Sequence, residues 1–586
     1  MRKLNSIIAA GLFALSMFAA PSADACTNFL FTKGATKDGS TMITYAADSH
    51  TLYGELYYRP AADYPAGTMC QVVDWDSGKK LIMIPQVRHT YSVVGNMNEW
   101  QLTIGETTYG GREELASEIE GSIDYGSYIY LTLQRAKNAR EAIQVLAGFM
   151  SQYPYHSEGE SFSIADPNEV WILELIGKRD GTVKPELAKK LKYKYTEGAV
   201  WVARRIPDGY VSGHANQARI TQFPLEGKWK KAKGKGLHKS ISSKHLDYLF
   251  EPEVECVYSD EVITYARACG WYNGKDEDFS FCDTYAPLTF SGLRGCEARV
   301  YAMFHRVASG MEKYEKYAMG DKNAERMPLW IKPDHKVDVR EVMNLMRDHY
   351  EGTAMDMTKD LGAGPFQCPY RWRPMGFELD GKKYVHERAT STQQTGFSFV
   401  AQCRSWLPAK VGGILWFGVD DTYSTVYCPM YCGITEIPLC FRQGNGDMVT
   451  YSETAAFWLF NRVTNFVYSR YSDMIVDLQK VQTNLEEGYI ADVQKFDNRA
   501  KQSEGEALTR QLNDFSNRQA MKMMKEWNNL DHYLLVKYMD GNIKKEKDGK
   551  FERTETGNAV FPMQPHYRQE WQRMIVNDHG DVIREK

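Results

Sequence analysis

The sequence predicts an α+β fold in which helices are layered on mostly antiparallel sheets. Three observations carry this prediction. Short apolar or alternating stretches bounded by turn residues come early in the chain, helical stretches separate them from further strands, and a long helical region closes the chain. A strict alternation of strands and helices would instead indicate a parallel βαβ array. The observed grouping therefore favours antiparallel sheets with helices on their faces.

The early strands are predicted from apolar runs and from the turns between them. Asp38-Gly39 lies between the first two strands, and Asp166-Pro167-Asn168 lies between a later pair, so each pair is predicted to form a hairpin. A further turn at 95–99 precedes the third strand. The predicted strands span residues 27–32, 41–46, 102–107, 161–165, 169–176 and 200–206.

The helices are predicted from apolar residues that recur close to every 3.6 positions. Residues 412–419 and 448–452 are apolar or β-prone, and the Lys-, Gly- and Ser-rich segment 228–244 reads as a solvated loop. The predicted helices span residues 113–120, 128–151, 454–471 and much of 473–540.

Composition limits the class of protein. The 586 residues are 43% hydrophobic and 25% charged, with a mean hydropathy of -0.49, which is typical of a soluble globular protein with a large core. A net charge of -4 predicts no nucleic-acid partner. The 13% aromatic content fits a β-rich core, or a surface that grips peptides or sugars.

The first 25 residues resemble a cleavable signal peptide. Arg2 and Lys3 precede an apolar run at 7–20, and Ala23-Asp24-Ala25 supplies the small-x-small pattern of a cleavage site. Cleavage there makes Cys26 the first residue and predicts an exported protein, periplasmic or extracellular. No later stretch approaches the ~20 apolar residues of a membrane span. We therefore divide the chain into a signal peptide (1–25), a main domain (26–472) and a helical C-terminal extension packed on the body (473–586).

A cysteine directly after a leader has a second explanation, the lipid-modified cysteine of a surface-anchored protein. That modification favours a Leu-like residue three positions before the cysteine and small residues between. Ala23 and Asp24 fit this pattern poorly, so the sequence favours an unmodified N-terminal cysteine.

Cysteine usage also bears on redox chemistry and metals. Of the 11 cysteines, setting Cys26 aside leaves an even number, which suits disulfides in an exported protein. Cys428 and Cys432 have no companion pair or His at zinc-ligand spacing, so we expect no metal site there.

An N-terminal cysteine carries its own base. Its α-amine has a pKa near 8, so at working pH it can take the proton of the thiol and leave a thiolate to attack a carbonyl. Such a site also needs a carboxylate to orient the amine and neutral donors to stabilise the oxyanion.

A set of short motifs follows the leader in a fixed order. They include CTN at 26–28, KDGSTMI at 37–43, GNMNE at 95–99, IGETT at 104–108, IAD at 164–166, HANQ at 214–217 and AAFW at 455–458. In this order the motifs resemble the C69 dipeptidase family, N-terminal-nucleophile hydrolases related to penicillin V acylase and bile-salt hydrolase. The likeness runs from Cys26 to around Tyr471.

The resemblance implies a catalytic set. Cys26 is similar to the nucleophile, with its amine as general base, and Asp48 to the carboxylate that holds the amine. Asn216 resembles the oxyanion-hole Asn. The family usually has Asn or Arg just before the acid, whereas this sequence has Tyr45-Ala46-Ala47. Without the resemblance, Asp48 reads as a turn residue and Asn216 as a possible helix cap.

Further polar residues are candidates for oxyanion or substrate binding. They are Asn98, Glu106, Thr107 and Arg219. For the carboxylate that reads a free substrate N-terminus, the candidates are Glu99, Glu106 and Asp166.

The resemblance implies an αββα sandwich, two stacked antiparallel sheets with helices outside, plus the helical C-terminal region. It implies hydrolysis of the amide bond of dipeptides without a cofactor. The chain could act alone or as a homo-oligomer. Two alternatives stay open at this point: an acylase acting on conjugated bile salts, β-lactams or acylated small molecules, and a lipid-anchored surface binding protein.

Overall fold

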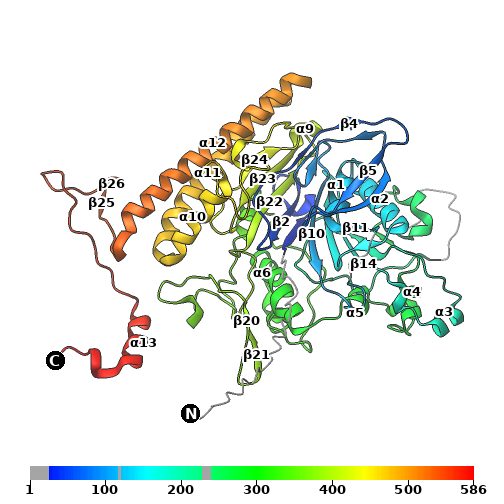
Figure 1. Cartoon of the computed structure of the whole chain (residues 1–586), viewed down its shortest axis with the longest axis horizontal. Coiled ribbons are helices and arrows are strands. Elements are labelled where there is room, and N and C mark those ends of the chain that lie inside the picture. Colours follow the sequence, from blue (N-terminus) through cyan, green and yellow to red (C-terminus); the bar gives the residue numbers. More distant parts are fainter. Residues whose placement is uncertain (1–25, 117–120, 228–238) are drawn as a thin grey trace, which may run out of the picture.

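The computed structural model describes residues 26–116, 121–227 and 239–586 and combines separate antiparallel sheets with helices (Figure 1). This arrangement agrees with the predicted α+β class. The predicted signal peptide at 1–25 lies outside the described residues, as do 117–120 and 228–238.

The first large sheet has seven strands in the order β19-β16-β1-β2-β22-β23-β24, all antiparallel. The predicted hairpin at 27–32 and 41–46 is confirmed, with Leu30 opposite Ile43. The strands are β1 (Asn28–Phe31), β2 (Thr41–Asp48), β16 (Val211–His214), β19 (Trp330–Ile331), β22 (Thr395–Cys403), β23 (Gly413–Val419) and β24 (Cys428–Tyr431).

The second large sheet has nine strands in the order β17-β18-β15-β14-β13-β10-β9-β8-β3. Neighbouring strands in this sheet run antiparallel, except β17 and β18, which are parallel. The predicted hairpin at 161–165 and 169–176 is confirmed. The strands are β3 (Tyr58–Arg59), β8 (Val93–Val94), β9 (Met97–Asn98), β10 (Thr103–Tyr109), β13 (Gly159–Ala165), β14 (Val170–Gly177), β15 (Ala199–Arg205), β17 (Ser240–Ser242) and β18 (Cys256–Tyr258).

The two sheets face each other, with β2 packed on β10 and β13. The alternating side chains of β14 show how one sheet contacts both the other sheet and the helices. Ile172 and Ile176 enter the core that contains the seven-stranded sheet. Trp171, Leu173 and Leu175 enter a second core together with helices α1 and α2. Because successive strand side chains point to opposite faces, β14 supports a sheet on one side and helices on the other.

Helices cover the outer faces of both sheets. α1 and α2 pack on the nine-stranded sheet, while α6, α8, α10, α11 and α12 contact strands of the seven-stranded sheet (Figure 1). The helices are α1 (Tyr125–Leu133), α2 (Ala139–Gln152), α3 (Pro185–Leu191), α4 (Val262–Cys269), α5 (Phe281–Tyr285), α6 (Ala298–Val307), α7 (Glu315–Ala318), α8 (Val339–Leu345), α9 (Ala409–Gly412), α10 (Ala456–Ser469), α11 (Tyr471–Ala500), α12 (Gly505–Tyr538) and α13 (Gln569–His579).

The predicted helical region at 473–540 forms α11 and α12, which pack on each other and on β24. α11 is anchored by Glu486, which is fully buried and ion-paired with Arg340 and, at 2.5 Å, with Arg347. A buried carboxylate is stable only while its cationic partners stay in place, because an unpaired buried charge costs several kcal/mol. The two ion pairs of Glu486 therefore fasten α11 to the body.

Several local predictions were wrong. The helix predicted at 128–151 is two helices, because the Asn138 side chain accepts the N–H of Glu141 and starts α2 anew. Residues 113–116 form a turn instead of a helix, and 448–452 form no strand. The predicted loop at 228–244 contains β17 in its described part.

The eleven cysteines are all unpaired, so the expected disulfides do not form. Most of the thiols are buried, which is the ordinary behaviour of a small apolar side chain. In the part of the chain that the structure describes, no helix is both long and apolar enough to cross a membrane.

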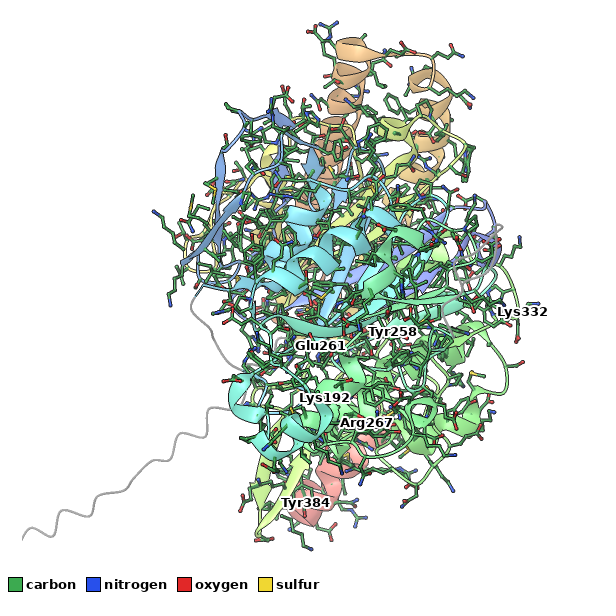
Figure 2. All side chains as sticks on the ribbon, turned by 90° about the vertical axis from the view of Figure 1, so that its right-hand side faces the viewer. Lys192, Tyr258, Glu261, Arg267, Lys332 and Tyr384 are labelled. Atoms are coloured by element: carbon green, nitrogen blue, oxygen red, sulfur yellow. The ribbon has the colours of Figure 1, made fainter. Side chains whose placement is uncertain are left out.

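One hairpin stands away from the sheets. β20 (Gly376–Leu379) and β21 (Lys382–Val385) are exposed along their whole length. The hairpin projects from the body in both views, with Tyr384 labelled on it in Figure 2.

Candidate active site

Cys26 is the first described residue and lies directly before β1, with 4% of its surface exposed. A bridge between Thr27 and Ala46 extends the pairing of β1 with β2, which brings Cys26 to the end of β2. The Cys26 thiol donates to Glu106 Oε1 at 3.4 Å and to the Tyr45 hydroxyl at 3.7 Å. The Tyr45 hydroxyl also donates to Glu106 Oε1. The thiol, phenol and carboxylate therefore form one buried cluster.

The surroundings of Cys26 hold its thiol in the protonated form. Burial raises the pKa of the thiol well above its usual value, and the negative charges of Glu106 and Asp48 raise it further. A backbone hydrogen bond from Asp48 and the Tyr45 hydroxyl act in the opposite direction. Since the thiolate is the nucleophilic form, this thiol needs a base close by.

Asp48 lies fully buried at the end of β2, in the cluster around Cys26. Its carboxylate accepts from Arg388 Nη2 at 2.6 Å and from the Thr395 hydroxyl at 2.6 Å. Burial raises the pKa of Asp48, and Arg388 and Thr395 oppose that rise. The family usually has Asn or Arg just before this acid; in this chain Arg388, far along the sequence, contacts the carboxylate.

Arg299, on α6, is a site residue that sequence reasoning missed. Its guanidinium is 1% exposed and donates to the Cys26 carbonyl at 2.6 Å and to the Thr27 hydroxyl at 2.8 Å. It also donates to Asn216 Oδ1 at 2.9 Å. A planar fork with five donors fixes several acceptors at once. Arg299 therefore fixes the backbone of Cys26 relative to the turn after β16.

Asn216 occupies that turn with a positive φ of 55°, a conformation that Asn tolerates better than most residues. Its Nδ2 donates to the Thr108 carbonyl of β10 at 2.6 Å. Residues 217–223 form no helix, so Asn216 is a turn residue and not a helix cap. The structure brings Asn216 to Cys26 through their shared partner Arg299.

Thr107 is directed to His214 instead of the thiol. Its hydroxyl lies 2.8 Å from His214 Nδ1, and the Ser163 hydroxyl lies 2.7 Å from Nε2. Burial lowers the pKa of His214 to about 3, with the positive charge of Arg219 contributing. His214 is therefore a neutral imidazole that joins the two sheets.

Arg219 is also held away from Cys26. It forms an ion pair with Glu297 at 2.8 Å and donates to the carbonyls of Gly213 and Pro328 at 2.8 Å each. Its backbone N–H donates to Glu174 at 2.6 Å. These contacts fasten the segment after β16 to the loop before β19, a structural role.

The remaining candidates lie elsewhere. Asn98 donates to the carbonyls of Leu133 and Ala136 at 2.7 Å each, and so fixes the junction of α1 and α2. Glu99 accepts the N–H of Ser92 at 3.0 Å. Asp166 accepts the N–H of Ala139 at 2.8 Å, at the start of α2. Of the three carboxylates proposed to read a substrate N-terminus, Glu106 alone contacts Cys26.

Sequence alone gave no signal for Arg299 or Arg388, because each is one arginine among many, in a segment far along the chain. Tyr45 was visible as a departure from the family pattern, but its bond to Glu106 was not. Within the described residues, no group of three or more His, Cys, Asp or Glu side chains is placed to hold a metal ion.

Residues 25–484 match the model of Peptidase family C69, which places the chain in the class of peptidases. The chain belongs to peptidase family C69. The match begins next to Cys26 and ends within α11, so it includes both large sheets.

Curated relatives are similar over most of their length. The chain is 21% identical to "Probable dipeptidase" of Latilactobacillus sakei, covering 76% of this chain and 82% of that protein. It is 21% identical to "Probable dipeptidase" of Salmonella dublin, covering 72% and 84%. It is 20% identical to "Probable dipeptidase B" of Streptococcus pyogenes serotype M1, covering 84% and 89%.

Proposed function

We propose that this chain is an exported dipeptidase whose nucleophile is the thiol of Cys26, activated by the α-amine of the same residue after removal of residues 1–25. The observation that carries the proposal is the buried cluster of Cys26, Tyr45 and Glu106 at the start of β1, next to Asp48. The names of the curated relatives support dipeptides as the substrates.

The reaction divides into two steps. The amine takes the thiol proton, the thiolate attacks the peptide carbonyl, and the resulting ammonium gives its proton to the leaving amine. In the second step the same amine takes a proton from water, and the water oxygen attacks and hydrolyses the thioester. Asp48 is assigned to hold the ammonium, which fits its position at the end of β2 beside Cys26.

The oxyanion needs preorganised donors. We assign the side chain of Asn216 to the oxyanion, as the resemblance to the family implies; it lies in the turn that Arg299 joins to Cys26. Arg299 acts as the positioning residue, because it bonds both Asn216 and the Cys26 carbonyl. Glu106 is assigned to the free ammonium of the dipeptide, which would limit the enzyme to substrates with an unblocked N-terminus.

The fold proposed for this chemistry is the αββα sandwich of N-terminal-nucleophile hydrolases. Two facing sheets with helices on their outer faces support it. The peptidase family model and the names of the curated relatives favour neither the acylase nor the surface-anchored alternative.

The test compares three forms of the exported, N-terminally sequenced protein: wild type, Cys26→Ala and the control Cys256→Ala, which removes an equally buried thiol from β18. Wild type and Cys256→Ala should hydrolyse a dipeptide panel, and Cys26→Ala should lose at least about 1,000-fold in kcat while keeping its melting temperature. An uncleaved leader should leave the chain inactive. Full activity of folded Cys26→Ala would refute the mechanism.

A further inference from the structure

A partly open cavity that Tyr45 lines lies beside the proposed nucleophile. Its walls are mainly aromatic, and several of the residues come from segments far apart in the chain. The aromatic residues are Tyr45, Tyr57, Trp75, Tyr125, Tyr130 and Phe397. Concave sites with mainly aromatic and apolar walls are typical places for small molecules to bind.

The outer wall is held in place by specific contacts. Trp75 lies in the turn between β5 (Met69–Val73) and β6 (Lys80–Pro85), with its ring 4.7 Å from that of Tyr57. The Trp75 backbone N–H donates to Asp124 at 3.1 Å, and the same carboxylate oxygen accepts the N–H of Ser127 in the first turn of α1. The turn is therefore fastened to α1.

Gly126 makes this contact possible. A Cβ at Gly126 would lie 2.4 Å from Trp75, closer than any real packing allows. The indole therefore rests directly on the backbone of α1. This close approach indicates that the position of Trp75 is built into the fold.

Tyr45 connects the cavity to the reaction centre. Its ring lines the cavity and packs edge-on against Phe397, with centroids 5.7 Å apart. Its hydroxyl lies 3.7 Å from Cys26 Sγ and bonds Glu106. A substrate atom attacked by Sγ is thus separated from the cavity by one tyrosine side chain.

The chemistry of a dipeptide decides which of its side chains enters. The ammonium, the side chain and the scissile carbonyl of its N-terminal residue all branch from one Cα. With the carbonyl at Cys26 and the ammonium at Glu106, the third branch leaves on the side of Tyr45, which contacts both of those residues. That side is the aromatic cavity.

We infer that this cavity selects dipeptides whose N-terminal residue has a large apolar or aromatic side chain. The inference rests on the proposed function. Filling a hydrophobic pocket is worth about 10- to 100-fold in kcat/KM, so Phe-Ala and Leu-Ala should exceed Gly-Ala by that factor. The same side chain on the C-terminal residue, as in Ala-Phe, should give no comparable gain.

The experiment uses the mature chain and two cavity variants with opposite effects on shape. Trp75→Ala removes a wall, and Leu52→Trp adds bulk at a partly exposed lining position. Each should lower the Phe-Ala to Gly-Ala ratio of kcat/KM by about 10-fold. The control Trp406→Ala, an exposed indole outside the cavity lining, should leave the ratio as in wild type.

The outcomes separate this inference from the proposed function. Cleavage of no dipeptide at all would reject the function itself. Equal cleavage of Phe-Ala and Gly-Ala, or a preference for Ala-Phe, would overturn the inference while the function stands. A wild-type ratio in both folded cavity variants would place the selective pocket elsewhere. A fall that affects both dipeptides equally would show that the residues are structural only, which also overturns the inference.

Discussion

Replacing His214 by glutamine should change how the stability of the protein depends on pH. His214 is fully buried in β16, between the hydroxyls of Thr107 and Ser163. Burial lowers its pKa to about 3, from an ordinary value of 6.5. Glutamine can keep hydrogen bonds to both hydroxyls but cannot take up a proton.

The sign follows from the direction of the shift. A histidine with a lowered folded-state pKa contributes stability that is fully present above 6.5 and is lost as the pH falls towards 3, because the unfolded chain takes up a proton that the folded chain refuses. The slope approaches 1.36 kcal/mol per pH unit only between the two pKa values, so wild type should lose about 2 kcal/mol from this residue between pH 6.5 and 4.5. From pH 6.5 to pH 3 the loss should reach about 4 kcal/mol.

The assay is denaturant unfolding of wild type and His214→Gln at several pH values from 7.5 to 4. Other titrating groups are common to both proteins, so the difference between the two curves isolates His214. His532→Gln, at an exposed position on α12, is the matched control and should follow wild type. Parallel curves for wild type and His214→Gln would refute the reasoning.

Three other substitutions test the site and the attachment of the C-terminal helices. Arg299→Lys keeps the charge but loses the planar fork, so kcat for a dipeptide should fall about 100-fold; an unchanged kcat would remove its positioning role. Asp48→Asn leaves Arg388 without its buried partner, which should cost about 3 kcal/mol in chemical denaturation. It should also move the acid limb of the pH–rate profile to lower pH, because no carboxylate then stabilises the ammonium; a limb that stays in place would contradict that assignment. Glu486→Ala should destabilise the chain by about 3–5 kcal/mol in the same denaturation assay, whereas the exposed Glu487→Ala should not; equal effects would show that α11 is not fastened by this carboxylate.

Local patterns in the sequence predicted much of the first half of the fold. The β1–β2 and β13–β14 hairpins follow from short apolar strands on either side of turn residues, which act over a few positions only. Helix α10 followed equally from its own periodicity. These elements need no information from distant parts of the chain.

β22 shows where such reading fails. β22 lies beside β2 in the middle of the seven-stranded sheet. We did not predict it as a strand, because the polar residues Ser398 and Gln402 interrupt its apolar run. Both are buried and satisfied by groups outside the strand. Ser398 donates to the Tyr427 hydroxyl at 3.2 Å, and Gln402 donates to Asp38 at 2.8 Å. Polar residues in a strand are acceptable when tertiary partners exist, and those partners are invisible in the sequence.

The site divides in the same way. Cys26 was predicted from its place behind the leader, and Asp48 from the resemblance to the C69 dipeptidase family. Arg299 and Arg388 reach them from 273 and 340 residues away. Arg219 was proposed as a residue that supports the site electrostatically, but its guanidinium forms an ion pair with Glu297. The arginines that contact Cys26 and Asp48 come from segments that only the tertiary fold brings there.

The order of strands in the seven-stranded sheet has a consequence for synthesis. β1 and β2 leave the ribosome well before β22, yet β2 lies beside β22, which ends at Cys403. At about 5–20 residues per second, roughly 20–75 s separate the emergence of Cys26 from that of Cys403. During that time the apolar strands β1 and β2 lack the neighbour that completes their sheet. A chain that stops before β22 therefore leaves one edge of β2 without its hydrogen-bonded partner.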